Sequence, residues 1–232
     1  TVFVDRVELG NTWIVRKEDE QTTVVRLKES EDLKRVMFEL GVRPSDIFFS
    51  NGIIFVEGQT EKVVLPTLAN KMGINFQELE LSVIPIYGKS SGRYHLKTWI
   101  EASKSAQIPY FMVLDKGAEG EAKKFVKDGL LKPDENLFIL KKGSIEDYYP
   151  PDELASALKD EYEIELNEQQ QKRLSEMPVA ETIEKLLKDK GKETKGWKVA
   201  VGSRISQLML VEHIDDEIKR ILERIQTNLR IR

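Results

Sequence analysis

Acidic side chains stand at three points of the sequence, each directly or shortly after a short apolar run. These acids are Glu57 and Glu61, Asp115, and Glu146. Carboxylates gathered in one place repel one another unless a cation neutralises their charge. The chain has no cysteine and only two histidines, so an oxygen-ligated Mg²⁺ or Mn²⁺ is favoured over zinc. Phosphoryl chemistry is the usual use of such an open carboxylate site.

Each acid also has a structural interpretation. Glu61 lies four residues after Glu57, so a helical turn can bring both to one side, but it can equally complement a helix dipole behind a Thr60 cap. Asp115 can be a helix cap or turn former, and Glu146 can belong to an acidic first helical turn. The combination of acids at one sheet edge is more informative than any of them alone.

The elements expected to position these acids lie in residues 51–150. Short apolar runs (IIFV, SVIPIY, YFMVL and LFIL) alternate there with segments of helical character (EKVVLPTLANKM, 94–103 and EGEAKKFVKDG). This alternation predicts an α/β fold with a parallel sheet of about four strands and helices on both faces. Ligands of such sheets gather at the carboxyl ends of the strands, where the acids stand.

The flanking segments have different patterns. Residues 1–50 contain three runs rich in β-branched residues and then LKRVMFEL, which predict an N-terminal β-meander and a short helix. Residues 151–232 are highly charged and predict a C-terminal helical extension, with candidate helices at 152–162, 168–188 and 203–229.

The bulk composition restricts the class of protein. No stretch approaches the roughly 20 apolar residues of a membrane span and no signal peptide is recognisable, so we expect a cytoplasmic protein without a membrane partner. The net charge of -4 lacks the basic excess of a protein that coats DNA, so any contact with nucleic acid must be local or bridged by metal. The chain begins without methionine inside a predicted strand, and we interpret it as a fragment.

Taken together, the motifs resemble those of one family. VEGQTEKVVLP is similar to the Glu-Gly-x-x-Glu signature that opens a Toprim domain. VIPIYGKSS, VLDKG and KKGSIEDYYP follow in the order seen in the OLD (overcoming lysogenization defect) nucleases, and the resemblance covers about residues 1–205. It implies that residues 1–50 end an upstream ATPase domain, 51–150 form a Toprim catalytic core, and 151–232 complete the nuclease domain.

The resemblance also implies roles for individual residues. Glu57, Asp115 and Lys198 match catalytic positions, although Lys198 can equally be an exposed lysine in a short strand. The metal-site positions of the family are matched by Glu57, Glu61, Asp115, Ser144 and Glu146. Gly117 stands where these domains usually have a second acid, and Glu119 is a possible substitute, with Glu121 as another.

The function that follows from the resemblance is a DNA endonuclease or nickase using one or two Mg²⁺ or Mn²⁺ ions. The full-length protein is expected to be a homodimer, with ATP bound only in the upstream domain. Lys89 and Arg93 are candidate DNA contacts in a segment that can equally be a solvated loop. The alternative, favoured by Gly117, is a module without catalysis that serves the ATPase as a dimerisation or DNA-docking platform.

Overall fold

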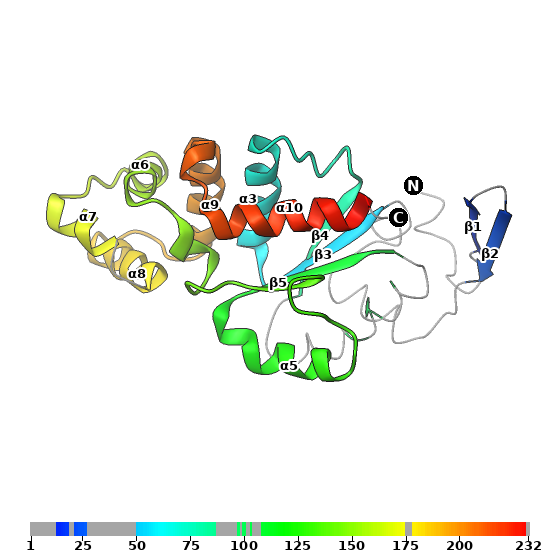
Figure 1. Ribbon diagram of the computed structural model, residues 1–232. Coiled ribbons are helices and arrows are strands. Elements are labelled where there is room, and N and C mark those ends of the chain that lie inside the picture. The colour runs from blue at the N-terminus through cyan, green and yellow to red at the C-terminus, as the bar shows by residue number, and fades with distance from the viewer. Residues whose placement is uncertain are drawn as a thin grey trace.

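The computed structural model describes residues 13–18, 21–26, 50–86, 97, 99–100, 103, 108–174 and 178–230 (Figure 1). The first run of the expected meander, the short helix at 33–40, and the segment with Lys89 and Arg93 lie outside these residues. The strands β1 (Trp13–Glu18) and β2 (Gln21–Arg26) pair antiparallel in a two-stranded sheet of their own. These two strands agree with the second and third runs of the meander.

A four-stranded parallel sheet forms the centre of the fold. Its strands are β3 (Gly52–Val56), β4 (Leu81–Pro85), β5 (Tyr110–Leu114) and β6 (Leu137–Ile139). The spatial order is β4-β3-β5-β6, and every pairing between neighbours is parallel. The predicted sheet is therefore confirmed, and the carboxyl ends of β3 and β5 lie side by side.

Both faces of the sheet are covered, which explains why the strands are continuous apolar runs. Successive side chains of β3 alternate between the faces, so Ile54 and Val56 join one apolar cluster while Ile53 and Phe55 join the other. All four are completely buried. Figure 1 shows α3 (Gln59–Lys71), α9 (Trp197–Leu208) and α10 (Asp216–Arg230) on one face, and α5 (Glu119–Lys127) on the other.

The chain after residue 150 is helical, as expected. Besides α9 and α10 it contains α6 (Pro151–Tyr162), α7 (Glu168–Leu174), α8 (Val179–Asp189) and the short 3₁₀ helix η5 (Val211–His213). Residues from α6, α8, α9 and α10 belong to the same apolar cluster as Ile54. The helical extension is thus packed on the sheet. No helix in the described ranges is long and apolar enough to cross a membrane.

Two helix predictions were wrong. The expected helix at 168–188 is two helices, because Pro178 lacks an N–H and instead forms the N-cap of α8. The expected helix at 203–229 is also two. Between them Met209 turns into the core, and the Asp215 side chain caps α10 by accepting the N–H of Glu217 at 2.8 Å.

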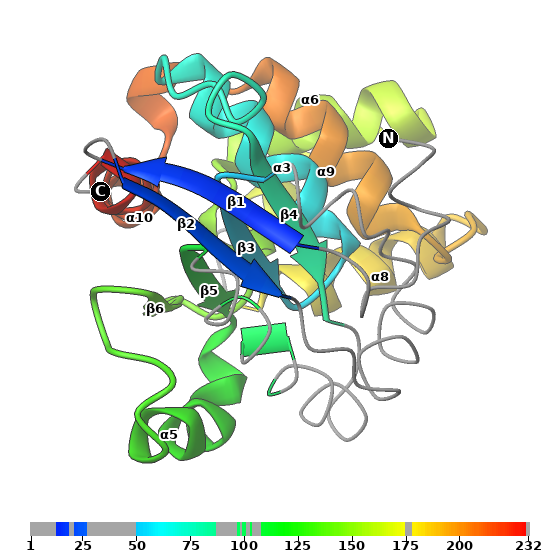
Figure 2. The same ribbon diagram turned by 90° about the vertical axis from the view of Figure 1, so that its right-hand side faces the viewer.

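The packing of α9 on α3 depends on a close approach at Gly202. Figure 2 shows the two helices side by side. A Cβ atom on Gly202 would lie 2.9 Å from the Thr60 Cγ2 atom and 3.1 Å from the Val64 Cγ2 atom. Only a residue without a side chain allows this approach.

Substitution of Gly202 by valine is expected to destabilise the protein. Overpacking between α9 and α3 should lower the free energy of unfolding by roughly 1–3 kcal/mol. The matched control is Gly120→Val in α5, where a Cβ would meet no atom within 4 Å and the change should be within about 0.5 kcal/mol. Denaturant unfolding of both variants measures the difference. Equal effects would show that Gly202 is not a packing constraint.

Candidate metal centre

Glu57 joins the carboxyl ends of the two central strands. It follows β3 directly, and its Oε1 atom accepts the backbone N–H of Asp115 at 3.0 Å. Asp115 follows β5, the parallel neighbour of β3. The structure therefore brings these two predicted site residues together. The Asp115 side chain makes no capping hydrogen bond to the 3₁₀ helix η3 (Lys116–Ala118) that follows, so it is not acting as a cap.

Glu61 extends this acidic group from the first turn of α3. Its side chain is buried, and its Oε2 atom accepts the N–H of Gly58 at 3.0 Å. Glu61 thus stands in the first turn of α3, where an acidic side chain complements the helix dipole as predicted. The predicted cap was wrong, because the N-cap of α3 is Gly58 and not Thr60. Burial raises the pKa of Glu61, and the nearby charges of Glu146 and Glu57 add to the increase.

Asp115 experiences the negative charge of all three other acids. Burial, together with the charges of Glu57, Glu61 and Glu146 and against an opposing effect from Lys198, raises the pKa of Asp115 to about 8. Four carboxylates thus share one partly buried environment, and one of them retains its proton near neutral pH. A divalent cation would offset the same repulsion by replacing that proton.

Glu146 and Lys198 complete the group from two elements outside the sheet, the 3₁₀ helix η4 (Ile145–Tyr148) and α9. Glu146 lies in η4 and is only 2% exposed, whereas the Lys198 side chain is 42% exposed. The Lys198 Nζ atom lies 3.5 Å from the Glu146 Oε1 atom. Lys198 stands in the first turn of α9, so the alternative of a lysine in a short strand was wrong.

The loop before η4 is organised by Asp147, a residue that was not among the predicted site residues. Asp147 Oδ2 accepts the N–H of Ser144 at 2.9 Å and faces its hydroxyl at 3.4 Å, while Oδ1 accepts the N–H of Val179. A Cβ on Gly143 would overlap the Asp147 carboxylate. The available sequence signal was Ser-x-x-Asp, which has the spacing of a capping box.

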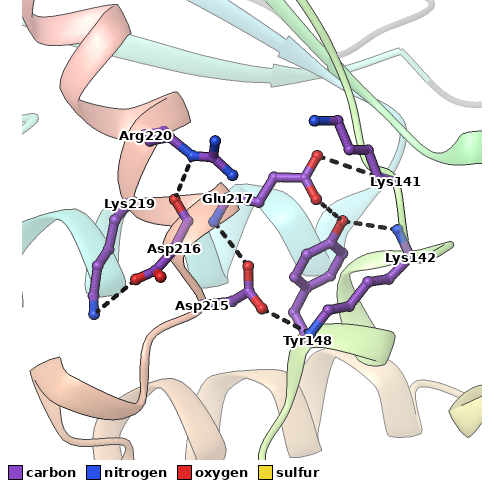
Figure 3. Close-up of polar contacts among 8 residues, drawn as sticks. All are labelled: Lys141, Lys142, Tyr148, Asp215, Asp216, Glu217, Lys219 and Arg220. Atoms are coloured by element: carbon purple, nitrogen blue, oxygen red, sulfur yellow. Dashed lines mark hydrogen bonds and ion pairs between the residues drawn. The ribbon is translucent and has the colours of Figure 1, made fainter.

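The same loop is fastened to the start of α10 (Figure 3). The Tyr148 hydroxyl donates to Glu217 Oε2 at 2.7 Å and accepts the N–H of Lys142 at 3.0 Å. The Lys142 ammonium forms an ion pair of 2.7 Å with Asp215, and Glu217 Oε1 accepts the N–H of Lys141. Burial and the contact with Glu217 raise the pKa of Tyr148, so it stays a neutral donor. These contacts hold the segment that carries Glu146.

The other predicted residues lie outside this group or at its border. Glu119 is exposed at the start of α5. A Cβ on Gly117 would meet no atom within 4 Å, so an acid at this position would encounter no steric obstacle. Ser144 lies near the acids in the chain, but its hydroxyl is directed at Asp147.

The donor set suits a hard divalent cation, although the side chains are not arranged around one. In the described part of the chain, no three His, Asp or Glu side chains have the spacing of a metal site. Two of the carboxylates are hydrogen-bonded to backbone N–H groups instead. Binding would require these side chains to rotate toward the ion. The rotation would be favourable because the ion would offset the repulsion between the carboxylates.

Comparison with known proteins is consistent with this architecture. A parallel sheet with acids at its carboxyl edge defines the class as a Toprim-like α/β fold. Residues 48–116 match the family described as "Overcoming lysogenization defect protein-like, TOPRIM domain". This match agrees with the resemblance noted in the sequence.

Solved structures share the fold over most of the chain. The C-terminal region of the OLD protein of Xanthomonas campestris pv. campestris matches with a TM-score of 0.60 and 16% identity, covering 80% of this chain and 97% of that one. The corresponding region of the Burkholderia pseudomallei protein matches with a TM-score of 0.57 and 19% identity, covering 78% and 100%. The comparison with curated proteins found no match.

The raised pKa of Asp115 predicts how the stability of the metal-free protein depends on pH. Unfolded Asp115 loses its proton near pH 3.8 and the folded residue near pH 8, so the folded state holds more protons between these values. This contribution to stability is present at low pH and is lost as the pH rises from about 4 to about 8.

Replacement of Asp115 by asparagine should remove that dependence. Relative to the parent protein, Asp115→Asn should become progressively more stabilising between pH 5 and pH 8 in the presence of a chelator. Thermal unfolding at a series of pH values measures this trend, with Asp128→Asn at an exposed position as control. A stability difference independent of pH would contradict the assignment.

Proposed function

We propose that this chain is the nuclease part of an OLD-type protein and hydrolyses phosphodiester bonds of DNA with Mg²⁺ or Mn²⁺. The observation that carries the proposal is the meeting of Glu57, Glu61, Asp115 and Glu146 beside Lys198 at the carboxyl edge of the parallel sheet. The match of residues 48–116 to an OLD-like Toprim domain supports it.

The carboxylates would hold the cation. Glu57, Asp115 and Glu146 are the proposed ligands, with Glu61 and Ser144 in supporting positions. A divalent ion held there would supply Lewis acidity and an activated water near neutral pH. Asp115 contributes by giving up its proton as the ion arrives, so metal binding is expected to release protons.

Lys198 is the residue proposed to contact the phosphate. Its ammonium group lies at the border between the buried Glu146 and solvent, so it can reach a phosphate oxygen without leaving the site. A fixed positive charge at that point would stabilise the charge that develops on the phosphate during hydrolysis. The 3.5 Å ion pair of Lys198 with Glu146 supports this role, as does its lowering effect on the pKa of Asp115.

We propose the same domain organisation for the intact protein as the resemblance implies. Residues 1–50 would end an upstream ATPase domain, 51–150 form the catalytic core, and 151–232 complete the nuclease. The matched structures are C-terminal regions of longer OLD proteins, which supports this division. We further propose that the intact protein is a cytoplasmic homodimer that binds ATP in its upstream domain. Its substrate would be DNA, with Lys89 and Arg93 as DNA contacts.

A second candidate function is a docking or dimerisation platform without catalysis. The feature that favours it is Gly117, which replaces the second acid of the usual motif. Titration of the protein with Mn²⁺ in a calorimeter separates the two, because a platform needs no divalent ion at the acids. The stoichiometry also distinguishes a one-ion from a two-ion centre.

Loss of a proposed ligand should abolish cleavage. Glu57→Ala and Asp115→Ala are each expected to reduce Mn²⁺-dependent cleavage of plasmid DNA by at least about 100-fold, because each removes one of the three proposed ligands. Asp128→Ala, at an exposed position of the same sign, should retain activity. Intact cleavage by either ligand variant would rule out this centre.

Lys198→Ala should affect turnover more than metal binding. Loss of the ammonium group is expected to lower kcat by roughly 100-fold to 1,000-fold, as for other groups that stabilise transition-state charge. Single-turnover kinetics at saturating Mn²⁺ measure the effect. Lys188→Ala, an exposed helical lysine in α8, is the matched control. An unchanged kcat for Lys198→Ala would remove this residue from the mechanism.

A further inference from the structure

Tyr149 has a buried hydroxyl that no described residue satisfies. The side chain is 5% exposed, its ring belongs to the main apolar cluster, and its Oη atom has no hydrogen-bond partner in the described part of the chain. Buried donors without partners are rare because removing them from water costs free energy. This hydroxyl is therefore a candidate for a functional role.

The hydroxyl lies between α3 and α9, beside the acidic group. A Cβ on Gly202 would be 2.9 Å from the Tyr149 Oη atom and 2.9 Å from Thr60 Cγ2, the residue that precedes Glu61. The backbone N–H of Tyr149 also donates to the Glu146 carbonyl at 3.3 Å. Burial raises the pKa of Tyr149 well above its ordinary value, and the charges of Glu146 and Glu61 add to the increase. The hydroxyl is thus a neutral donor whose pKa responds to the charges of both carboxylates.

The Glu146 carboxylate needs a second partner if Lys198 acts on a phosphate. Glu146 is almost fully buried and is paired with Lys198 in the structure. When the ammonium group turns to a phosphate oxygen, the carboxylate must orient toward the metal with another donor to fix it. Tyr149 is a buried donor from the same segment of the chain, and its hydroxyl has no partner among the described residues.

We propose that Tyr149 is a positioning residue of the metal centre, whose hydroxyl donates a hydrogen bond to the Glu146 carboxylate when a divalent cation is bound. This inference rests on the proposed function, since it requires the acids to hold an ion. The Tyr149 hydroxyl, which has no partner among the described residues, would thus gain one when the metal binds. Tyr149 thereby acts through Glu146 and touches neither the ion nor the DNA.

The inference predicts opposite effects on stability and metal affinity. Tyr149→Phe keeps the ring in the core and removes only the unsatisfied hydroxyl, so the Tm of the metal-free protein should be unchanged or higher. Its affinity for Mn²⁺ should fall by roughly 10-fold or more, the usual effect of losing a group that orients a metal ligand. The free-Mn²⁺ signal in electron paramagnetic resonance reports this affinity without a cleavage assay.

Tyr110→Phe is the matched control. The Tyr110 hydroxyl donates to the Leu130 carbonyl at 2.6 Å, and the residue stands at the start of β5, at the end of the sheet opposite the acids. Its loss should lower the Tm and leave Mn²⁺ affinity unchanged. This pattern is the reverse of that expected for Tyr149→Phe.

The outcomes of this experiment separate the failure of the Tyr149 role from the failure of the proposed metal-dependent function. If the parent protein binds Mn²⁺ and Tyr149→Phe binds it equally well, the role of Tyr149 is overturned while the proposed function stands. If Tyr149→Phe loses both Tm and affinity, the residue is structural and the inference is overturned. If the parent protein binds no Mn²⁺, both proposals are overturned.

Discussion

The mutual repulsion of four carboxylates at the carboxyl edge of the sheet is the constraint on which the rest of the structure depends. Glu57, Glu61, Asp115 and Glu146 come from three separate parts of the chain and share a partly buried environment. The metal-free protein limits the repulsion by keeping a proton on Asp115 and by placing Lys198 beside Glu146. A divalent cation would do so more effectively, and this difference is the thermodynamic basis of the proposed metal site.

Several packing contacts of the fold hold the four acids and Lys198 close together. Strands β3 and β5 are neighbours, so the first two acids share an edge. The close contact at Gly202 brings the start of α9, and with it Lys198, onto α3. The hydrogen bonds of Tyr148 to Glu217 fasten the segment that carries Glu146 to α10. Two apolar clusters, one on each face of the sheet, provide the stability that offsets the buried acids.

Much of this arrangement was predictable from local sequence patterns. The four strands are continuous apolar runs, and a parallel sheet requires that residues following them share one edge, which is why Glu57 and Asp115 were expected together. The helix boundaries at Pro178 and Asp215 were missed because the apolar spacing continues through both positions. The motif resemblance, and not spacing, led to Lys198.

Other features depend on contacts between distant parts of the chain and have no local signal. Glu217 and Asp215 support the η4 segment through partners far away in sequence, so nothing in their own surroundings marks them. Asp147 is the exception, because its spacing from Ser144 is that of a capping box and is a local signal. The unsatisfied hydroxyl of Tyr149 becomes visible only when every neighbour has been placed in space.

The central claim is that the four acids form a site for a divalent cation. Its most direct test is a crystal structure of the protein soaked in Mn²⁺, with the ion located by its anomalous scattering. The account predicts an ion coordinated by oxygen atoms of Glu57, Asp115 and Glu146. An acidic group that remains without an anomalous peak at saturating Mn²⁺, in crystals at a pH above 8, would contradict it.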